Sequence, residues 1–208
     1  MLNKRFIIVF TVSLTAGFLF SFYKYSRDAS RVAPAGAGKG TDMADIDKNY
    51  ETATLAGGCF WGMEEIMRKI PGVVETAVGY TGGDLENPKY EDVKSGNTGH
   101  AEAIETKFDP AKLSYGALLD LFFKMHDPTT LNRQGNDAGS QYRSAIFYRT
   151  PAQKTEAEAA VKRAQASGLW RRPLTTEIVM FKKFWPAEES HQDYLKKHPG
   201  GYTCHYMR

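Results

Sequence analysis

Two cysteines carry the strongest chemical signal in this sequence of 208 residues. Cys59 directly follows Gly57 and Gly58 and opens a predicted helix. A thiol at a helix N-terminus faces unpaired backbone N–H groups and the positive end of the helix dipole, and both favour the nucleophilic thiolate. The glycines would let the backbone approach a ligand closely. The position predicts a reactive nucleophile, with a buried, inert cysteine as the alternative.

Cys204 stands on a glycine-rich tail near the end of the sequence. A tail cysteine can reach a distant thiol, as a resolving cysteine must after the first thiol is oxidised to sulfenic acid. A permanent disulfide to Cys59 and an unpaired thiol are the alternatives. Two cysteines exclude a disulfide-rich scaffold and a four-cysteine metal site. Cys204 and the adjacent His205 match no metal-ligand spacing, so neither a metal nor another cofactor is expected.

Glu102 begins a predicted strand whose alternation places it on the same face as Ile104. A carboxylate on an apolar face is costly unless it is protonated or paired. Burial would raise the pKa of Glu102 and make it a proton donor near neutral pH. The alternative is that Glu102 faces solvent beside Glu105.

Five further side chains have both a chemical and a structural interpretation. Asp137, in a glycine-rich loop, could be a general base or a turn former, and turns favour aspartate. Tyr90 and Tyr142 could donate hydrogen bonds to a bound oxygen or be buried structural phenols. Phe60 and Trp61 follow the first cysteine and could line a small apolar pocket or belong to the core.

Hydrophobic periodicity and the Gly and Pro positions define the elements that must hold these residues. Predicted strands cover 52–56, 73–80, Ala101–Phe108, Ser144–Tyr148 and 177–181, and predicted helices cover 59–70, Tyr90–Lys94, Tyr115–Met125, Pro151–Ala166 and 187–196. A polar loop spans 133–140, and a loose tail begins at Lys197. This order predicts an α+β fold, a ferredoxin-like split β-α-β two-layer core with a C-terminal extension. Helices would cover one face of a mainly antiparallel sheet.

The N-terminal segment predicts export. Lys4 and Arg5 precede an uncharged run over 6–23, close to the ~20 residues that cross a bilayer as a helix. Aromatic and basic residues follow the run where a cleavage site would have small ones, which favours an uncleaved anchor over a signal peptide. Three parts are therefore expected: a signal anchor or signal peptide (1–25), a flexible linker (26–50) and a catalytic domain (51–208). The domain would be membrane-anchored or exported, on the periplasmic or other extracytoplasmic side.

Charge and composition limit the partners. The first 50 residues hold seven Lys/Arg and four Asp/Glu, whereas the rest holds 20 of each. A neutral body argues against nucleic acid, whose phosphates require a surplus of cations. A hydrophobic content of 42% and an aromatic content of 12% suffice for an ordinary packed core.

Four segments in this order resemble the peptide methionine sulfoxide reductase A family: GGCFWGMEE (57–65), PKYEDVKSGNTGHAEA (88–103), HDPTTLNRQGNDAGSQYRSAI (126–146) and HQDYLKKHPGGY (191–202). The resemblance runs from about residue 52 to 208. It implies thiol-dependent reduction of the S epimer of methionine sulfoxide, free or within proteins.

The resemblance also implies a role for each candidate residue. The implied roles are nucleophile (Cys59), contacts to the substrate methyl group (Phe60, Trp61), proton donor to the sulfoxide oxygen (Glu102), hydrogen bonds to that oxygen (Tyr90, Tyr142), ordering of the site (Asp137) and resolution of the sulfenic acid (Cys204). The product would be a disulfide that a thioredoxin-type dithiol reduces. A monomer is expected.

The chain departs from the family pattern in places. Lys94 stands where some members have a cysteine, and Cys204 is the only C-terminal cysteine where many have two. Cys204 also lies one residue further beyond the Gly201-Tyr202 pair than in those members. Two other classes stay open: a thiol enzyme or redox sensor that turns over peroxide through Cys59, and a membrane-tethered protein-binding module with a degenerate site.

Overall fold

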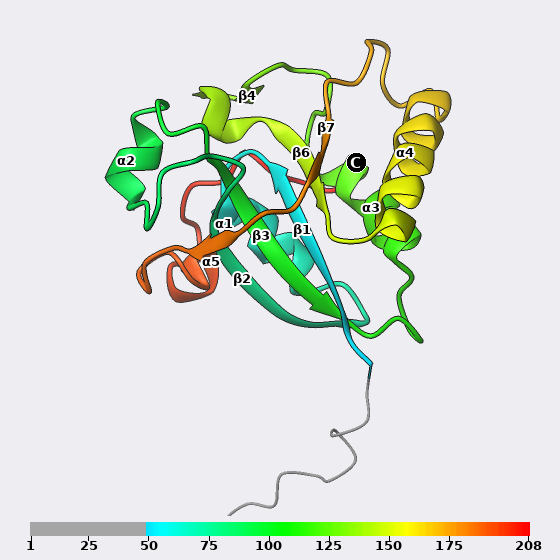
Figure 1. Cartoon of the computed structure of the whole chain (residues 1–208), viewed down its shortest axis with the longest axis horizontal. Coiled ribbons are helices and arrows are strands. Elements are labelled where there is room, and N and C mark those ends of the chain that lie inside the picture. The colour runs from blue at the N-terminus through cyan, green and yellow to red at the C-terminus, as the bar shows by residue number, and fades with distance from the viewer. Residues whose placement is uncertain (1–48) are drawn as a thin grey trace, which may run out of the picture. The chain divides into compact units, whose positions relative to one another are not determined.

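The structure, a computed structural model, describes residues 49–208 (Figure 1). The predicted anchor and nearly all of the predicted linker lie outside the described residues. Within 49–208, every helix is too short or too polar to cross a bilayer.

Regular elements account for most of the described chain up to residue 186. The helices are α1 (Phe60–Met67), α2 (Tyr90–Lys94), α3 (Tyr115–Met125), the 3-10 helix η2 (Ser140–Tyr142), α4 (Pro151–Ala166) and α5 (Tyr194–Lys197). The strands are β1 (Glu51–Gly57), β2 (Val73–Thr81), β3 (Ala101–Phe108), β4 (Arg133–Gln134), β5 (Asp137–Ala138), β6 (Ser144–Tyr148), β7 (Glu177–Met180) and β8 (Phe184–Pro186).

The main sheet has six strands in the order β7-β6-β1-β3-β2-β8. Its central strands pair antiparallel, β6 with β1, β1 with β3 and β3 with β2, and only the β6–β7 pair is parallel. The chain order β1-α1-β2-β3-α3-β6 therefore forms two successive β-α-β units in one mixed sheet. The predicted α+β class is confirmed.

One face of this sheet carries the main core. Apolar residues of β1, β3 and β6 pack there against α1, α3 and α4, and α3 and α4 lie beside each other (Figure 1). The other face has a thin layer of alanines with Phe147, covered by Phe181 and Phe184. Phe181 lies in the β7–β8 connection and Phe184 begins β8, and this part of the chain crosses β1 and β3 in orange in Figure 1. The helices cover one face, as predicted.

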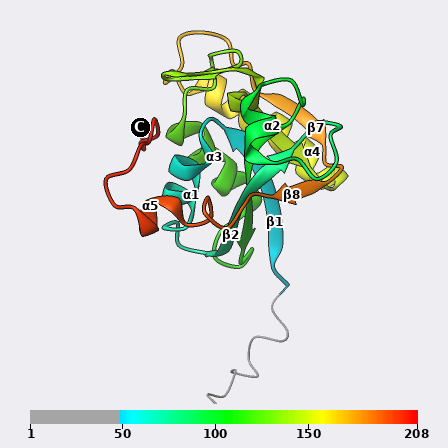
Figure 2. The same cartoon turned by 90° about the vertical axis from the view of Figure 1, so that its left-hand side faces the viewer.

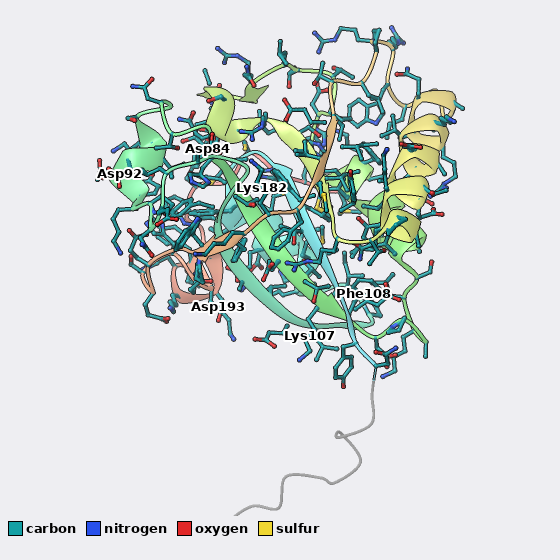
Figure 3. All side chains as sticks on the ribbon, in the orientation of Figure 1. Asp84, Asp92, Lys107, Phe108, Lys182 and Asp193 are labelled. Atoms are coloured by element: carbon teal, nitrogen blue, oxygen red, sulfur yellow. The ribbon has the colours of Figure 1, made fainter. Side chains whose placement is uncertain are left out.

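The connection from β7 to β8 brings the C-terminal part of the chain to the far edge of the sheet. Lys182 and Asp84, labelled in Figure 3, form an ion pair whose Nζ–Oδ1 distance is 3.6 Å. β8 then pairs with β2. The next segment lies against α1 and leads to α5, where Figure 3 labels Asp193 (Figure 2).

The predicted helix over 187–196 is wrong, because only the single turn of α5 forms there. Side-chain contacts to the sheet hold the segment in an irregular conformation instead. The carboxylate of Glu188 accepts hydrogen bonds from the Tyr80 hydroxyl and the Tyr90 N–H, both at 3.0 Å. Gln192 bonds the backbone of Val78 at both its N–H and C=O groups. Asp193 has a φ of 53°, which a helix cannot continue.

The other boundaries differ by less. α1 ends at Met67, earlier than the predicted 59–70, and β7 stops one residue short of 181. The predicted polar loop over 133–140 contains the β4–β5 hairpin, whose Gly135 has a φ of 57°. The predicted strand over Ala101–Phe108 and the helices over Tyr115–Met125 and Pro151–Ala166 form as predicted.

Candidate active site

Cys59 lies at the sharp turn between β1 and α1. It is the N-cap residue of α1 and is 6% exposed. Gly58 has a φ of 109°, which favours glycine, and a Cβ at Gly57 would lie 3.1 Å from the His126 ring. The two glycines thus allow the strand to turn tightly and place the thiol in a cavity.

The cavity at this turn has a volume of about 150 Å³ and gathers residues from distant parts of the sequence. Its lining is Cys59, Phe60, Trp61, Tyr90, Glu102, Asp137, Tyr142 and Tyr202. Seven of these were predicted as site residues, and Tyr202 was not. A larger cavity of about 390 Å³ adjoins α3 and α4 and has no cysteine in its lining.

Glu102 lies on the helix-covered face of β3 and is 3% exposed. Its Oε2 accepts a hydrogen bond from the N–H of Phe60 at 3.1 Å, so it bonds the first turn of α1. Burial raises the pKa of Glu102 to about 8, with a smaller contribution from the Asp137 carboxylate. The prediction of a buried acid is confirmed, and the solvent-facing alternative is wrong. At pH 7 the carboxyl group holds a proton that it can donate.

The expectation of a Cys59 thiolate is wrong for the substrate-free site. Burial raises the pKa of this thiol, and the nearby Glu102 carboxyl raises it further. A hydrogen bond from the Trp61 N–H lowers the pKa, as the helix N-terminus predicted, but desolvation is the larger effect. Cys59 is therefore a neutral thiol until a substrate changes its surroundings.

Two phenols face the same cavity. Tyr90 begins α2, and Tyr142 ends η2. Burial, together with the nearby Glu102, raises the pKa of Tyr90 to about 12 and raises the pKa of Tyr142 as well. Both hydroxyls keep their protons at neutral pH and can donate hydrogen bonds to a bound oxygen.

A cluster of aromatic rings holds Phe60 and Trp61, which form the apolar wall of the cavity. The indole N–H of Trp61 donates to Nδ1 of His191 at 3.1 Å, and the Trp61 ring stacks on Tyr194 at 3.8 Å between centroids. His191 also contacts the rings of Phe60 and Tyr90, at 5.5 and 4.4 Å. His191 and Tyr194 were not predicted as site residues, because their contacts depend on how the segment after β8 folds back.

Asp137 joins the β4–β5 hairpin to the C-terminal tail. Its Oδ1 accepts a hydrogen bond from the Tyr202 hydroxyl at 2.9 Å, and its Oδ2 accepts one from the Cys204 thiol at 3.4 Å. Asp137 pairs with Gln134 at the end of the hairpin turn, and its carboxylate bonds the tail and not the turn. Tyr202 stood inside the tail motif of the sequence, but nothing in its spacing predicted this bond.

Both cysteines are free thiols in the structure. Cys204 is half-buried, and burial together with the Asp137 carboxylate raises its pKa to about 12. A hydrogen bond from the backbone N–H of Cys59 acts in the opposite direction. The tail thus holds the sulfur of Cys204 against the turn that carries Cys59.

Comparisons with known proteins identify the family of this chain. The profile of the family described as "Peptide methionine sulfoxide reductase" matches residues 51–208. "Peptide methionine sulfoxide reductase MsrA 1" of Mesorhizobium japonicum is 54% identical over 158 residues, which are 76% of this chain and 90% of that protein. "Peptide methionine sulfoxide reductase MsrA" of Nocardia farcinica is 53% identical over 75% of this chain and 89% of its own length.

Solved structures are similar as well. Mxr1 from Saccharomyces cerevisiae in reduced form superposes with a TM-score of 0.73 at 38% identity, over 76% of this chain and 92% of that one. Methionine sulfoxide reductase A of Corynebacterium diphtheriae gives a TM-score of 0.66 at 38% identity, over 74% and 77% of the two chains. Mxr1 in complex with Trx2 gives 0.52 at 28% identity, over 76% and 90%.

Proposed function

Because this chain belongs to the peptide methionine sulfoxide reductase family, we propose that its reaction forms a sulfenic acid on Cys59 and then a disulfide with Cys204. Members of this family are oxidoreductases for the S epimer of peptide methionine sulfoxide, and so is this chain. One observation carries the proposal: a thiol and a protonated carboxyl group share one small cavity, and the second thiol lies beside it.

Substrate binding uses the aromatic wall and the phenols. The methyl group of the sulfoxide packs on Phe60 and Trp61, because apolar surface is best placed against these rings. The hydroxyls of Tyr90 and Tyr142, which line the same cavity, donate to the sulfoxide oxygen. Only one epimer can then present its sulfur lone pair, methyl group and oxygen in this arrangement and leave the sulfur open to Cys59.

Chemistry begins with the proton on Glu102. Its transfer to the sulfoxide oxygen makes the sulfur electrophilic, and the carboxylate that remains can accept the proton of the neutral Cys59 thiol. The Cys59 sulfur bonds to the substrate sulfur. The hydroxyl oxygen then moves to the Cys59 sulfur as the sulfur–sulfur bond and the sulfur–oxygen bond of the substrate both break, which leaves sulfenic acid on Cys59 and releases methionine. Glu102 ends the step protonated, as it began.

Resolution uses the tail. Cys204 attacks the sulfenic acid, water leaves, and a Cys59–Cys204 disulfide forms. A thioredoxin-type dithiol then reduces the disulfide by thiol–disulfide exchange. The complex of the yeast relative Mxr1 with Trx2 supports such a reductant. No resident cofactor is part of this proposal.

We further propose that the N-terminal run over 6–23 attaches a monomeric catalytic domain to a membrane or exports it, with the domain on the extracytoplasmic side. The length of this uncharged run and the Lys4-Arg5 pair before it support membrane targeting. Disulfides persist there, so the reductant would have to be delivered to that compartment. Protease treatment of intact cells tests the location, because a cytoplasmic domain would be protected.

The first test of the function uses the full chain, purified in detergent, with dithiothreitol as reductant. The substrates are the separate S and R epimers of a blocked methionine sulfoxide. Turnover of the S epimer alone, lost in Cys59→Ser, is the expected result. Turnover of neither epimer, with peroxide consumed instead, would overturn the proposal in favour of a thiol peroxidase.

A further inference from the structure

The His205 ring packs in a space that two glycines, Gly58 and Gly62, leave open. The ring lies against Gly58, where an added Cβ would come within 3.1 Å of Cε1. A methyl group on Gly62 of α1 would overlap Nδ1 and the hydroxyl of Thr203. His205 is 7% exposed, and its backbone N–H donates to Thr203 Oγ1 at 3.1 Å. The tail is therefore fixed around this ring.

The hydrogen bonds of the ring define its tautomer. Nε2 lies 2.8 Å from the carbonyl oxygen of Gly57, which can only accept, so Nε2 carries the proton. Burial lowers the pKa of His205 to about 4, and the ring is neutral at pH 7. Nδ1 is then left with a free lone pair, 3.4 Å from the sulfur of Cys204.

The Cys204 thiol thus lies between two acceptors, Nδ1 of His205 and Oδ2 of Asp137, each 3.4 Å from Sγ. A thiol whose pKa is about 12 cannot supply enough thiolate at neutral pH, so its attack needs a base. The Asp137 carboxylate already accepts the Tyr202 hydroxyl, whereas Nδ1 has no other polar partner among the described hydrogen bonds.

We propose that His205 is a catalytic residue of the resolving step, in which Nδ1 takes the proton of Cys204 and returns it to the leaving oxygen. This inference rests on the proposed resolving role of Cys204. As the Cys204 sulfur bonds to the Cys59 sulfur, the S–H bond breaks and its proton moves to Nδ1. The S–OH bond of Cys59 breaks, and hydroxide receives that proton and leaves as water. The oxidation of the second thiol balances the reduction of the sulfenic acid.

Other charged groups around the ring fit this task. The Asp137 carboxylate stabilises a transient imidazolium, whereas Arg208 opposes it and keeps the ring neutral at rest. His126, on the other side of the Gly57 turn, is itself a buried neutral ring and brings no charge. The imidazolium is therefore short-lived and acidic, so it returns its proton readily.

The test is a single turnover without reductant, in which the full chain reacts with the S epimer of blocked methionine sulfoxide. Methionine measures the first step, a sulfenic acid trap measures the intermediate, and the mass of the Cys59–Cys204 peptide measures the disulfide. His205→Gln retains an N–H near Gly57 and removes the basic nitrogen. His198→Gln makes the same change elsewhere on the tail and serves as the control.

In His205→Gln we expect methionine to form at the normal rate and the disulfide to form ~10–100-fold more slowly, with accumulated sulfenic acid. The rate of disulfide formation in this variant should rise about tenfold per pH unit between pH 7 and 9, because only Cys204 thiolate then reacts. The unmodified chain should show a much weaker pH dependence. A displaced tail alone would lower the rate without creating this slope.

Other outcomes have definite meanings. A normal disulfide rate with a flat pH profile in His205→Gln overturns the inference alone. The inference is also overturned if Asp137→Asn makes disulfide formation pH-dependent and His205→Gln does not, because the carboxylate is then the base. If the unmodified chain makes methionine but no Cys59–Cys204 disulfide, the resolving role in the proposed function is wrong as well.

A second variant keeps the inference testable if glutamine disturbs the tail. His205→Ala leaves a cavity the size of an imidazole ring beside Cys204. Added imidazole should restore disulfide formation, and pyrazole, a ring of the same size and far weaker basicity, should not. Equal rescue by both rings would show that His205 only fills space and would overturn the inference.

Discussion

The two cysteines lie in regions that are built in different ways. Cys59 is fixed by regular structure, between the end of β1 and the first turn of α1. The N–H of the next residue, Phe60, donates a hydrogen bond to Glu102 of β3. Cys204 stands on a tail without helix or strand after residue 197, where single side-chain bonds replace a backbone ladder. The first region suits a reaction that needs fixed geometry. The second suits the proposed resolving thiol, which must move to bond with the Cys59 sulfur and must then be accessible to a reductant protein.

Removing each thiol in turn should give the largest difference between the two regions, measured as methionine formed and as continued turnover. Cys59→Ser should lower methionine formation by at least ~10³-fold, because the covalent step is lost. Cys204→Ser should still make about one methionine per chain and retain a trappable sulfenic acid. With a thioredoxin-type reductant, Cys204→Ser should then make no further methionine, whereas the unmodified chain should continue to turn over. Multiple turnovers by Cys204→Ser with that reductant would show that the tail thiol is dispensable.

The next effect concerns the proton donor. Glu102→Gln should lower the rate of the first step by ~10²–10³-fold, because the amide has no proton to give. In the unmodified chain the rate should fall above pH about 8, since the pKa of Glu102 is about 8 and only its protonated form donates. The variant should lack that fall. Stopped-flow or quench measurements of methionine from pH 6 to 10 would reveal it, and an identical pH profile in both proteins would contradict the role.

The phenols should contribute less. Tyr90→Phe and Tyr142→Phe should each lower the rate of the first step by ~10–100-fold, since each removes one donor to the developing negative charge. Tyr115→Phe is the matched control, because the buried Tyr115 hydroxyl has no hydrogen-bond partner among the described residues and lies outside the cavity. Equal effects at Tyr115 and Tyr142 would indicate a general loss of packing.

Gly62→Ala should show that one residue of the Cys59 region also positions the Cys204 region. A methyl group there would overlap Thr203 and His205, so the tail must shift. We expect a roughly tenfold slower disulfide step with normal methionine formation, as general base catalysis is partly lost. A slower first step would instead mean that α1 itself had moved.

The smallest effect should appear in stability. The folded pKa of Glu102 is raised, so the unfolded chain loses this proton at a lower pH than the folded chain, and stability falls as pH rises from about 4.5 to about 8. Glu102→Gln removes this loss. Each pH unit in that window lowers the unfolding free energy of the unmodified chain by about 1.4 kcal/mol. The variant should therefore unfold at a higher temperature than the unmodified chain at pH 8 and at a similar temperature at pH 4. Thermal scans at both pH values would show whether catalysis costs stability here.

The same contrast explains what could be predicted from the sequence. Strong local patterns predicted the elements that hold Cys59 and Glu102, because β1, β3 and α3 have clear apolar periods and Gly or Pro boundaries. Strand alternation left two alternatives for Glu102, buried beside Ile104 or solvent-facing beside Glu105, and the structure shows that it is buried. The segment after β8 failed because its conformation depends on distant partners, such as Glu188 with Tyr80 and Tyr90.

Other site features also lay beyond local pattern. The helix-dipole argument for Cys59 considered one local effect and could not weigh the desolvation that outweighs it. The position of the His205 ring requires a glycine more than 140 residues earlier in the chain. No rule of residue spacing relates two positions so far apart in the sequence. Family resemblance, and not periodicity, identified Asp137 as a site residue, and the structure adds its bond to Tyr202.

The small cavity beside Cys59 also limits when a damaged protein can be repaired. A volume of about 150 Å³ admits the end of one side chain and none of the fold around it. An oxidised methionine inside a folded client must first leave that client's interior by local opening. Repair should then follow the population of the opened form, and each additional ~1.4 kcal/mol of opening free energy should slow it tenfold. The order in which oxidised sites are restored would thus report the local stability of the clients more than the preference of the enzyme.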